Sequence, residues 1–486
     1  MTLGLLGILL GLGLLVGLSF RGWSVLLLAP LGAMCAALLA GEPLMAHWTL
    51  TFMNSAARFL AQFFPLFLLG ALFGKLMENS GSIAAVADLL MRKLGANRAM
   101  LAVVLAGALV TYGGVSLFVA FFVLAPMARR LFQRAGIPRR LMPAAIVLGT
   151  STFTMSALPG TPAIQNAIPM PFFGTTPFAA PGLGVIAALI MLGFGLYWLH
   201  LMEQRARRAG EGFETGATAA APPTVGSAAL RERAVAAREF DPAEILHGAA
   251  AAAPLPASLA LLPLVVVVAV NLAMSLWALP RMDADFLREP RWSGASFAGL
   301  SGVWAVLTAL LCAIAAVIAI NWRRLPNLRE TIDAGANAAV LPALSVASLV
   351  GFGSVVAAMP AFETVRAWVL GIGGSPLISL AVATNLLAAL TGSASGGLTI
   401  ALDALGHAYM LRAAELGIDP ALLHRIAVIG AGTLDSLPHN GAVITLLAVC
   451  GSTHRESYRD IVMVGIVGAL LALVAVIALG ATFGGF

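Results

Sequence analysis

The chain has 486 residues, of which 60% are hydrophobic and only 10% are charged, and its formal net charge is +6. Soluble globular proteins carry about 25% charged residues, so this composition, with a mean hydropathy of +0.95, excludes an ordinary soluble domain. The basic residues fall in loops between hydrophobic runs, where membrane topology explains them better than nucleic-acid binding does.

An apolar run of about 18 residues or more is a candidate transmembrane segment. In the first half of the chain, full-length and shorter apolar runs lie at 3–20, 23–40, 57–77, 99–111, 115–128, 141–153 and 178–200. The first run lacks a basic segment before it, and its first positive charge, Arg21, comes after it, so it is not an obvious signal peptide. The cysteines Cys35, Cys312 and Cys450 lie far apart, so neither a disulfide framework nor a metal site nor a cofactor is expected.

The segment 99–128 has basic residues on both sides, which predicts that both of its ends face the cytoplasm. These flanking residues are Arg92, Lys93, Arg98, Arg129, Arg130, Arg134, Arg139 and Arg140. We therefore expect a re-entrant helical hairpin with its tip near residues 112–114. The next run, 141–170, is interrupted at "TMSALPGTP" (154–162), which predicts a broken helix that crosses outward before 178–200 crosses back.

Residues 203–256 differ in kind, because they are charged, rich in Ala, Pro and Gly, and show no clear apolar face. This composition predicts a flexible cytoplasmic linker between two membrane units, 1–202 and 257–486. After the linker, the apolar runs lie at 257–279, 299–320, 336–358, 376–390, 398–414, 421–434, 441–450 and 460–484.

The two membrane units align as an internal repeat. Phe73-Gly74 and Phe352-Gly353 are separated by 279 residues (352 − 73), and Leu158-Pro159 and Leu437-Pro438 recur at the same offset. Because the first unit contains five predicted crossings, an odd number, the second copy is inverted and its hairpin, 376–414, opens to the outside. The predicted fold is an all-α polytopic membrane protein, an inverted repeat of five crossings each, with two re-entrant hairpins and two broken helices.

Irregular backbone at membrane depth is tolerated only where protein or a water-filled cavity surrounds it. The two hairpin tips and the two breaks are therefore expected to meet near the midplane. Helix N-termini there suit a carboxylate, and carbonyls and hydroxyls suit a cation. The predicted substrate-binding residues are Tyr112, Gly113, Gly114, Ser116, Thr154, Ser156, Thr161, Thr391, Gly392, Ser393, Ser395, Gly396, Thr433, Ser436 and Asn440.

Asp435 is the strongest candidate for a proton-coupling group, because an ionisable residue inside a membrane segment indicates function. Its counterpart in the first unit is Ser156, so the repeat itself does not require the charge. His439 follows four residues later and titrates near neutral pH, so the pair could carry a proton. The alternative is that Asp435 caps a half-helix and His439 faces a loop. Asp403 and His407 form a further i, i+4 pair.

Four motifs resemble those of the gluconate:proton symporter (gluconate permease) family, within the superfamily of elevator-type organic-anion carriers. They are "FGKLMENSGS" (73–82), "TYGGVSLFVAFFVLAP" (111–126), "SALPGTPAIQNAIP" (156–169) and "SLPHNGAVITLLAVCGSTHRESYRDI" (436–461). The last motif resembles a branch associated with short hydroxy acids such as 3-hydroxybutyrate. The resemblance implies a multi-pass protein of the inner membrane, a homodimer, and a transport domain that moves against a fixed scaffold.

We therefore expect a secondary active symporter that carries a small organic anion, such as gluconate or a 3-hydroxybutyrate-like acid, with a proton. Its partners are then the anion, the coupling cation and the lipid bilayer, with no nucleic acid. A sodium-coupled or exchange carrier is the main alternative. An intramembrane enzyme is a further alternative, but no GxSxG or HExxH motif occurs in the sequence, and no enzyme activity is expected.

Overall fold

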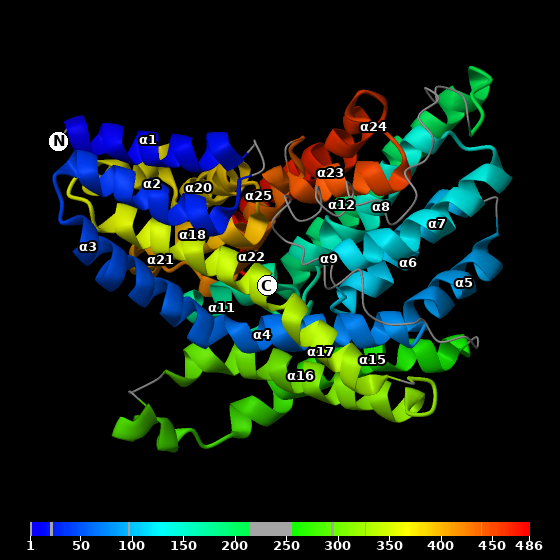
Figure 1. Cartoon of the computed structure of the whole chain (residues 1–486), viewed down its shortest axis with the longest axis horizontal. Helices are drawn as coiled ribbons and strands as arrows, with labels where there is room; N and C mark the ends of the chain where they lie inside the picture. Colours follow the sequence, from blue (N-terminus) through cyan, green and yellow to red (C-terminus); the bar gives the residue numbers. More distant parts are fainter. Residues whose placement is uncertain are drawn as a thin grey trace.

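The computed structural model describes residues 2–19, 23–95, 98–115, 117–213, 255–292, 296–325, 327–438 and 440–486. The described residues form helices and connecting loops and contain no β-strand, which confirms the predicted all-α class. Figure 1 shows hairpin α20–α21 at the left and hairpin α6–α7 at the right, with α4 running below both.

The helices before the predicted linker include several short pieces between residues 139 and 173. In chain order they are α1 (Thr2–Ser19), α2 (Val25–Ala40), α3 (Leu44–Ala46), η1 (His47–Phe52), α4 (Met53–Asn79), α5 (Ser82–Leu94), α6 (Ala99–Tyr112), α7 (Leu117–Ala135), η3 (Arg139–Leu141), α8 (Met142–Thr150), α9 (Phe153–Ser156), α10 (Ile164–Ala167), α11 (Pro169–Phe173) and α12 (Pro181–Arg208).

The helices after the linker show a similar succession of long and short elements. They are α15 (Ala257–Ala273), η4 (Met274–Ala278), η5 (Leu279–Arg281), η6 (Asp285–Arg288), η7 (Pro290–Trp292), α16 (Phe297–Asn321), α17 (Leu328–Ala338), α18 (Val340–Ala358), α19 (Phe362–Gly371), η8 (Ile372–Gly374), α20 (Pro376–Thr391), α21 (Ala394–Leu416), α22 (Pro420–Thr433), η9 (Leu434–Ser436), α23 (Gly441–Cys450), α24 (His454–Ile461), η10 (Val462–Val467) and α25 (Gly468–Phe483).

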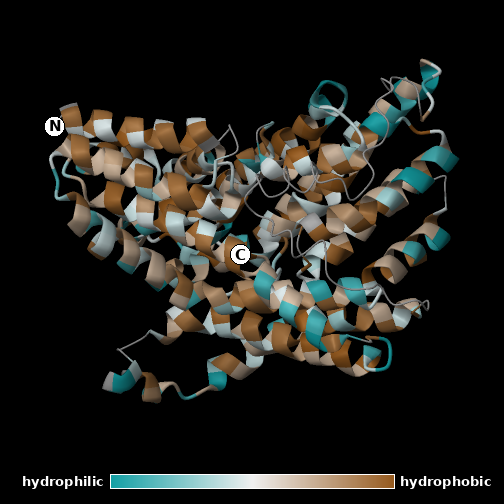
Figure 2. Ribbon diagram, in the orientation of Figure 1, coloured by the Kyte–Doolittle hydropathy of each residue, from teal (hydrophilic) through white to brown (hydrophobic). Residues whose placement is uncertain are grey.

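Six helices within the described residues are long and apolar enough to cross a membrane, so the chain is a multi-pass membrane protein. They are Leu44–Asn79, Pro181–Arg208, Ala257–Arg281, Phe297–Asn321, Leu328–Ala358 and His454–Phe483. Figure 2 shows hydrophobic residues dominating the outer helices, with hydrophilic residues gathered at helix ends and loops. The predicted crossings 3–20 and 23–40 correspond to the shorter apolar helices α1 and α2, and their topology stays a prediction.

The helices α4 and α18 pack against each other, with α2 on α18 and α16 on α4. Small residues permit these close contacts. A Cβ atom on Gly11 of α1 would lie only 2.4 Å from the carbonyl oxygen of Gly32 on α2, and one on Gly351 of α18 would lie 2.8 Å from the Phe52 ring.

Two helical hairpins lie where the sequence predicts them. The first, α6–α7, turns at residues 113–115, where Gly114 has a φ of 95°, a left-handed conformation that favours glycine. The second, α20–α21, turns at Gly392, whose φ is 64°, and Ser393 then caps α21 by accepting a hydrogen bond from the Gly396 N–H. The side from which each hairpin enters the membrane stays a prediction.

Two broken helices accompany the hairpins. The first break separates α8 from α10 and includes the short helix α9 and an irregular stretch at 157–163. The second break separates α22 from α23 through the single turn η9 and residues 437–440. The helix after each break packs against the hairpin from the other half of the chain: α11 contacts α21, and α23 contacts α7.

The helix α12 continues through Arg208, into the segment that the sequence predicts as linker. The residues that follow it turn back, and Glu211 forms an ion pair with Arg140 at 3.1 Å. The first part of the predicted linker is therefore structured, whereas its residues 214–254 lie outside the described residues.

Candidate functional site

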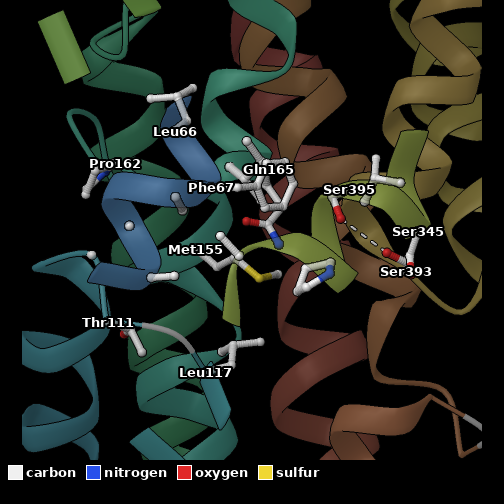
Figure 3. Close-up of a pocket in the computed structure, with 18 of the residues that line it drawn as sticks. Leu66, Phe67, Thr111, Leu117, Met155, Pro162, Gln165, Ser345, Ser393 and Ser395 are labelled. Atoms are coloured by element: carbon white, nitrogen blue, oxygen red, sulfur yellow. Dashed lines mark hydrogen bonds between the residues drawn. The ribbon is translucent and has the colours of Figure 1, made fainter. Parts of the chain in front are cut away.

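A cavity of about 220 Å³ lies between the two hairpin tips. Four groups of residues surround it: the tip of α6–α7, the first break, the tip of α20–α21, and the helices α4, α17 and α18. Its lining includes Leu66, Phe67, Gly70, Ala71, Thr111, Gly114, Val115, Leu117, Thr150, Met155, Pro162, Ala163, Ile164, Gln165, Ala338, Ala339, Pro342, Ser345, Val346, Leu349, Thr391, Gly392, Ser393 and Ser395. None of these described residues is charged, and Figure 3 shows several of their side chains around the cavity.

Five of the predicted substrate-binding residues line this cavity: Gly114, Thr391, Gly392, Ser393 and Ser395. The other described candidates do not line it. They are Tyr112, Gly113, Thr154, Ser156, Thr161, Gly396, Thr433, Ser436 and Asn440. Ser116 and His439 lie outside the described residues.

The first tip is fastened to the first break by two hydroxyl groups. Thr111 donates a hydrogen bond to the hydroxyl of Thr154 at 3.2 Å, and the phenol of Tyr112 donates one to the Pro159 carbonyl at 2.7 Å. Thr154 is fully buried and also donates to the Gly149 carbonyl at 2.9 Å. Tyr112 and Thr154 therefore hold the wall of the cavity. Thr111 lines the cavity but is not among the residues predicted to bind substrate.

The second tip is fastened to the second break by Asp435, whose side chain is nearly buried. Its Oδ1 accepts a hydrogen bond from the Ala394 N–H at the start of α21 and another from the Asn440 amide, each at 2.9 Å. The same Asn440 amide donates to the Gly392 carbonyl at 2.9 Å. A carboxylate at a helix N-terminus is stabilised by the helix dipole. Asp435 therefore caps α21 and also sits directly against the tip that lines the cavity.

The helix α24 braces the second break from its other side. The Tyr458 hydroxyl donates a hydrogen bond to the Ser436 carbonyl at 3.3 Å, and Nε2 of His454 lies 2.8 Å from the Pro438 carbonyl, to which it donates. The polar atoms of this break are thus engaged by the tip and by α24. This explains why Thr433, Ser436 and Asn440 do not line the cavity as the repeat predicts.

Gln165 is a lining residue that the sequence analysis missed. It follows the first break, and its side chain lies beside Phe67 and Met155 in Figure 3. Among the described residues, its amide has no hydrogen-bond partner, so both its N–H₂ and its carbonyl are available to a ligand. The only signal in the sequence was its place in the motif that follows the break.

The adjacent residues His424 and Arg425 of α22 are both fully buried behind the first break. The Arg425 guanidinium donates to the Ala179 carbonyl at 2.7 Å, and it lies 3.5 Å from both the Ser156 carbonyl and Oδ1 of Asn166. His424 contacts the same Asn166 oxygen through Nε2 at 3.1 Å. The sequence places His424 and Arg425 inside the apolar run 421–434 but gives no sign of their partners.

Asp403 and His407 do not pair with each other. The Asp403 carboxylate accepts a hydrogen bond from the Ser354 hydroxyl of α18 at 2.6 Å. Both Asp403 and His407 are exposed on α21. The i, i+4 spacing places two residues on one helix face, but α18 supplies a nearer partner for Asp403.

One transporter resembles this chain over nearly its whole length, and another resembles it over about a third. Residues 1–172 match the model of the GntP family permease. The chain is 40% identical over 483 residues to "Uncharacterized transporter YxjC" of Bacillus subtilis (strain 168), which covers 97% of this chain and 98% of that protein. It is 30% identical over 172 residues to "High-affinity gluconate transporter" of Escherichia coli (strain K12), which covers 34% of this chain and 37% of that protein.

The fold is similar to a solved structure, the crystal structure of the Alcanivorax borkumensis YdaH transporter, whose topology is described as unusual. The TM-score is 0.51, and the alignment covers 90% of this chain and 88% of that chain at 18% sequence identity. At this identity the likeness concerns the fold alone.

Proposed function

Because the chain belongs to the GntP permease family and is therefore a membrane transporter, we propose that it carries a small organic anion across the membrane together with a proton. The observation that carries this proposal is the cavity of about 220 Å³ between the two hairpin tips. It is smaller than the roughly 300–1,000 Å³ pockets that hold drug-sized ligands, so it suits a small metabolite.

The chemistry of the lining supports a hydroxylated acid as the substrate. Gln165 and the hydroxyls of Thr111, Thr150, Ser393 and Ser395 supply hydrogen-bond donors and acceptors for hydroxyl and carboxylate groups. The helix α7 begins at the cavity, where Leu117 is a lining residue, and the N-terminus of a helix favours an anion. Gluconate and 3-hydroxybutyrate both fit this description, and a gluconate transporter is among the relatives.

We propose that substrate binding requires the space beside Ser395. Ser395→Trp should fill the cavity and abolish uptake of labelled gluconate and 3-hydroxybutyrate into proteoliposomes, while size-exclusion chromatography shows an unchanged particle. Ser301→Trp, on α16 and outside the lining, is the matched control and should keep wild-type uptake. Normal uptake by the Ser395 variant would place the substrate elsewhere.

An inverted repeat is supported by the packing as well as by the sequence offset. At the offset of 279 residues, Asn79 at the end of α4 corresponds to Ala358 at the end of α18, and Tyr112 at the end of α6 corresponds to Thr391 at the end of α20. The contacts are also reciprocal, since α2 packs on α18 and α16 packs on α4. This pattern is expected of two copies related by a pseudo-two-fold axis.

We propose an elevator mechanism in which the hairpins and broken helices move as one body against α4, α18 and the helices packed on them. The cavity supports this division, because residues of both groups line it: Gly114 and Ser393 from the tips, Leu66 and Ser345 from α4 and α18. Sliding one group past the other would then expose the substrate alternately to the two sides. The homodimer and the inner-membrane location remain proposals from the family resemblance, and light scattering in detergent tests the first.

The membrane topology provides a separate test of the proposed fold. The basic flanks of hairpin α6–α7 predict that both of its ends lie in the cytoplasm. In a cysteine-free background, single cysteines at positions 97 and 133 should be modified by an impermeant thiol reagent from the same side. Labelling of the two positions from opposite sides would show that α6–α7 crosses the membrane, and it would contradict the proposed inverted topology.

We propose that Asp435 is the proton-linked group, with His439 assisting it. The carboxylate holds the second tip through the Ala394 N–H and Asn440 at 2.9 Å each. Protonation removes the charge that strengthens these bonds, so it would loosen the tip and also favour an anionic substrate nearby. Proton and substrate should then bind cooperatively, and this cooperativity is reciprocal.

The coupling test uses proteoliposomes without sodium. An inward proton gradient should drive wild-type accumulation, whereas Asp435→Asn should keep substrate exchange and lose gradient-driven accumulation. Asp403→Asn, on the exposed face of the same hairpin, is the matched control and should accumulate normally. Accumulation by the Asp435 variant on a pH gradient would show that the proton is carried elsewhere.

Sodium coupling is the second candidate, and one observation favours it. The Asp435 carboxylate and the Gly392 carbonyl accept hydrogen bonds from the same Asn440 amide nitrogen, so two oxygens of the kind that suits a hard cation lie close to each other. A requirement for sodium in wild-type uptake, with no effect of a pH gradient, would replace the proton with sodium at this place.

A further inference from the structure

Arg425 is a cation held in the interior of the protein by neutral partners. Its side chain is completely buried, and its guanidinium contacts the carbonyls of Ala179 and Ser156 and the amide oxygen of Asn166. Within the part of the chain that the structure describes, no carboxylate lies within 4.0 Å of it. A buried cation normally has a carboxylate partner, because desolvation of an unpaired charge is costly.

The neutral partners solvate this charge but do not cancel it. Carbonyl and amide oxygens have partial negative charges that orient toward the guanidinium, while the net charge of the group remains +1. Water and salt ions, which screen exposed charges within about 10 Å at ordinary ionic strength, do not reach a buried side chain. The positive potential of Arg425 therefore extends into the surrounding protein.

This potential extends toward two cavities. Ala179, whose carbonyl accepts from the guanidinium, lines an open cavity beside Asp419, and the residues that precede Asn166 and Ser156 line the cavity between the tips. These preceding residues are Gln165 and Met155, and each is therefore one Cα–Cα step, about 3.8 Å, from a residue that contacts the guanidinium. None of the described residues that line the cavity between the tips is charged, so a single buried cation behind this wall has a large influence on the cavity.

The partners of Arg425 also keep it in place. Oδ1 of Asn166 lies 3.5 Å from the guanidinium and 3.1 Å from Nε2 of His424, and the Asn166 amide donates to the Thr161 and Pro177 carbonyls at 3.0 Å. His424 is fixed in turn by Thr175, whose hydroxyl lies 2.6 Å from Nδ1. This network prevents the guanidinium from leaving the break for water.

We propose that Arg425 is a positioning residue of the transport site, which makes the wall formed by the first break electropositive. The carboxylate of the substrate then lies against Gln165, and its hydroxyl-bearing end points toward the tip at Ser393 and Ser395. The inference rests on the proposed function for the identity of the ligand, but the potential itself is a property of the folded protein.

The potential is measurable without a substrate. Gln165→Cys is introduced after Cys35, Cys312 and Cys450 are replaced, and the thiol is modified in turn with anionic MTSES and cationic MTSET. The ratio of the two rates, divided by the same ratio for 2-mercaptoethanol, cancels differences in reagent reactivity and thiol ionisation. We expect a normalised ratio above one in the otherwise unaltered protein, because the wall attracts the anionic reagent.

Arg425→Met should lower this ratio by about tenfold, since the lost charge acts with opposite sign on the two reagents. Arg425→Lys keeps the charge and should stay within about threefold of the starting ratio. Arg140→Met removes the same charge from a site outside the cavity lining and should leave the ratio unchanged. An unchanged ratio in a folded Met variant overturns the inference.

Two further readouts keep the test decisive. If Arg425→Met does not fold, the test rests on the normalised ratio of the Gln165→Cys protein that retains Arg425. A ratio of one or less in that protein overturns the inference. An unchanged ratio with intact organic-anion uptake rejects this inference alone. The expected ratio, with no uptake of any organic anion by wild-type protein, supports the electropositive wall and rejects the proposed function.

Discussion

Gly397 of α21 faces the backbone of α20, and a single added methyl group there tests how closely the two arms of the hairpin must pack. A Cβ atom at this position would lie 2.2 Å from the backbone nitrogen and 2.4 Å from the Cα of Ala388, and 2.5 Å from the carbonyl carbon of Leu387. Non-bonded heavy atoms prefer about 3.5 Å or more. The arms would therefore have to separate by about 1.3 Å.

This separation should lower both stability and uptake. Overpacking costs about 1–3 kcal/mol, and backbone atoms cannot turn aside as a side chain can, so we expect the upper half of this range. The better helix propensity of alanine offsets about 1 kcal/mol. The net cost of about 1–2 kcal/mol corresponds to a Tm lowered by roughly 1–2 °C for a chain of 486 residues, because the entropy of unfolding scales with chain length.

The effect of Gly397→Ala on transport should exceed its effect on stability. Ser393 precedes Gly397 by about one helical turn and Ser395 precedes it by two residues, and both line the cavity. A displacement of about 1 Å in a binding constellation costs up to 100-fold in rate, so we expect uptake to fall by about 10- to 100-fold. Differential scanning fluorimetry in detergent and uptake into proteoliposomes measure the two quantities.

Gly193→Ala on α12 is the matched control, because a Cβ atom there would meet nothing within 4 Å. Its Tm should be unchanged or slightly raised, and its uptake should equal that of the wild type. The reasoning is refuted if Gly397→Ala retains a Tm within 1 °C and uptake within twofold of the wild-type values.

Two further predictions concern contacts that join separate parts of the fold. Arg140→Gln should lower the Tm by several degrees, because it leaves Asp460, whose side chain is 3% exposed, without its ion pair at 3.2 Å. Arg207→Gln breaks only an exposed i, i+4 pair and should shift the Tm by less than 1 °C, so equal shifts would contradict this account. Tyr112→Phe removes the hydrogen bond to the Pro159 carbonyl, worth about 1 kcal/mol, and should slow uptake severalfold, whereas Tyr197→Phe on the exposed face of α12 should not.

The positions of the main elements were predictable because they depend on local signals. Long apolar runs predicted the helices, basic flanks predicted the α6–α7 hairpin, and Gly114 and Gly392 marked the turns that require left-handed backbone. The two breaks were predictable for the same reason, since Leu158-Pro159 and Leu437-Pro438 interrupt otherwise apolar segments.

The contacts inside the site were not predictable, because they join residues distant in the sequence. Ala179 and Arg425 are separated by 246 residues, and nothing local shows that the carbonyl of one receives the guanidinium of the other. One prediction from the repeat was wrong. The repeat predicted that both breaks line the cavity, but polar groups of the second break are hydrogen-bonded to other elements: Asp435 accepts from the Ala394 N–H, and Tyr458 donates to the Ser436 carbonyl. The repeat relates the backbones of the two halves but not their side chains. For example, the residue that corresponds to Arg425 at the offset of 279 is Ile146.

The partners of Arg425 also have a consequence for biosynthesis. The acceptors of the guanidinium, on Ser156, Asn166 and Ala179, are synthesised long before the helix α22 that carries it. Until α22 is inserted, these polar groups of the N-terminal half lack their hydrogen-bond donor. We therefore expect the first break to stay incompletely packed and open to membrane proteases during this time. A chain split within 214–254 should therefore survive in cells only when both fragments are produced together, and the N-terminal fragment made alone should be degraded.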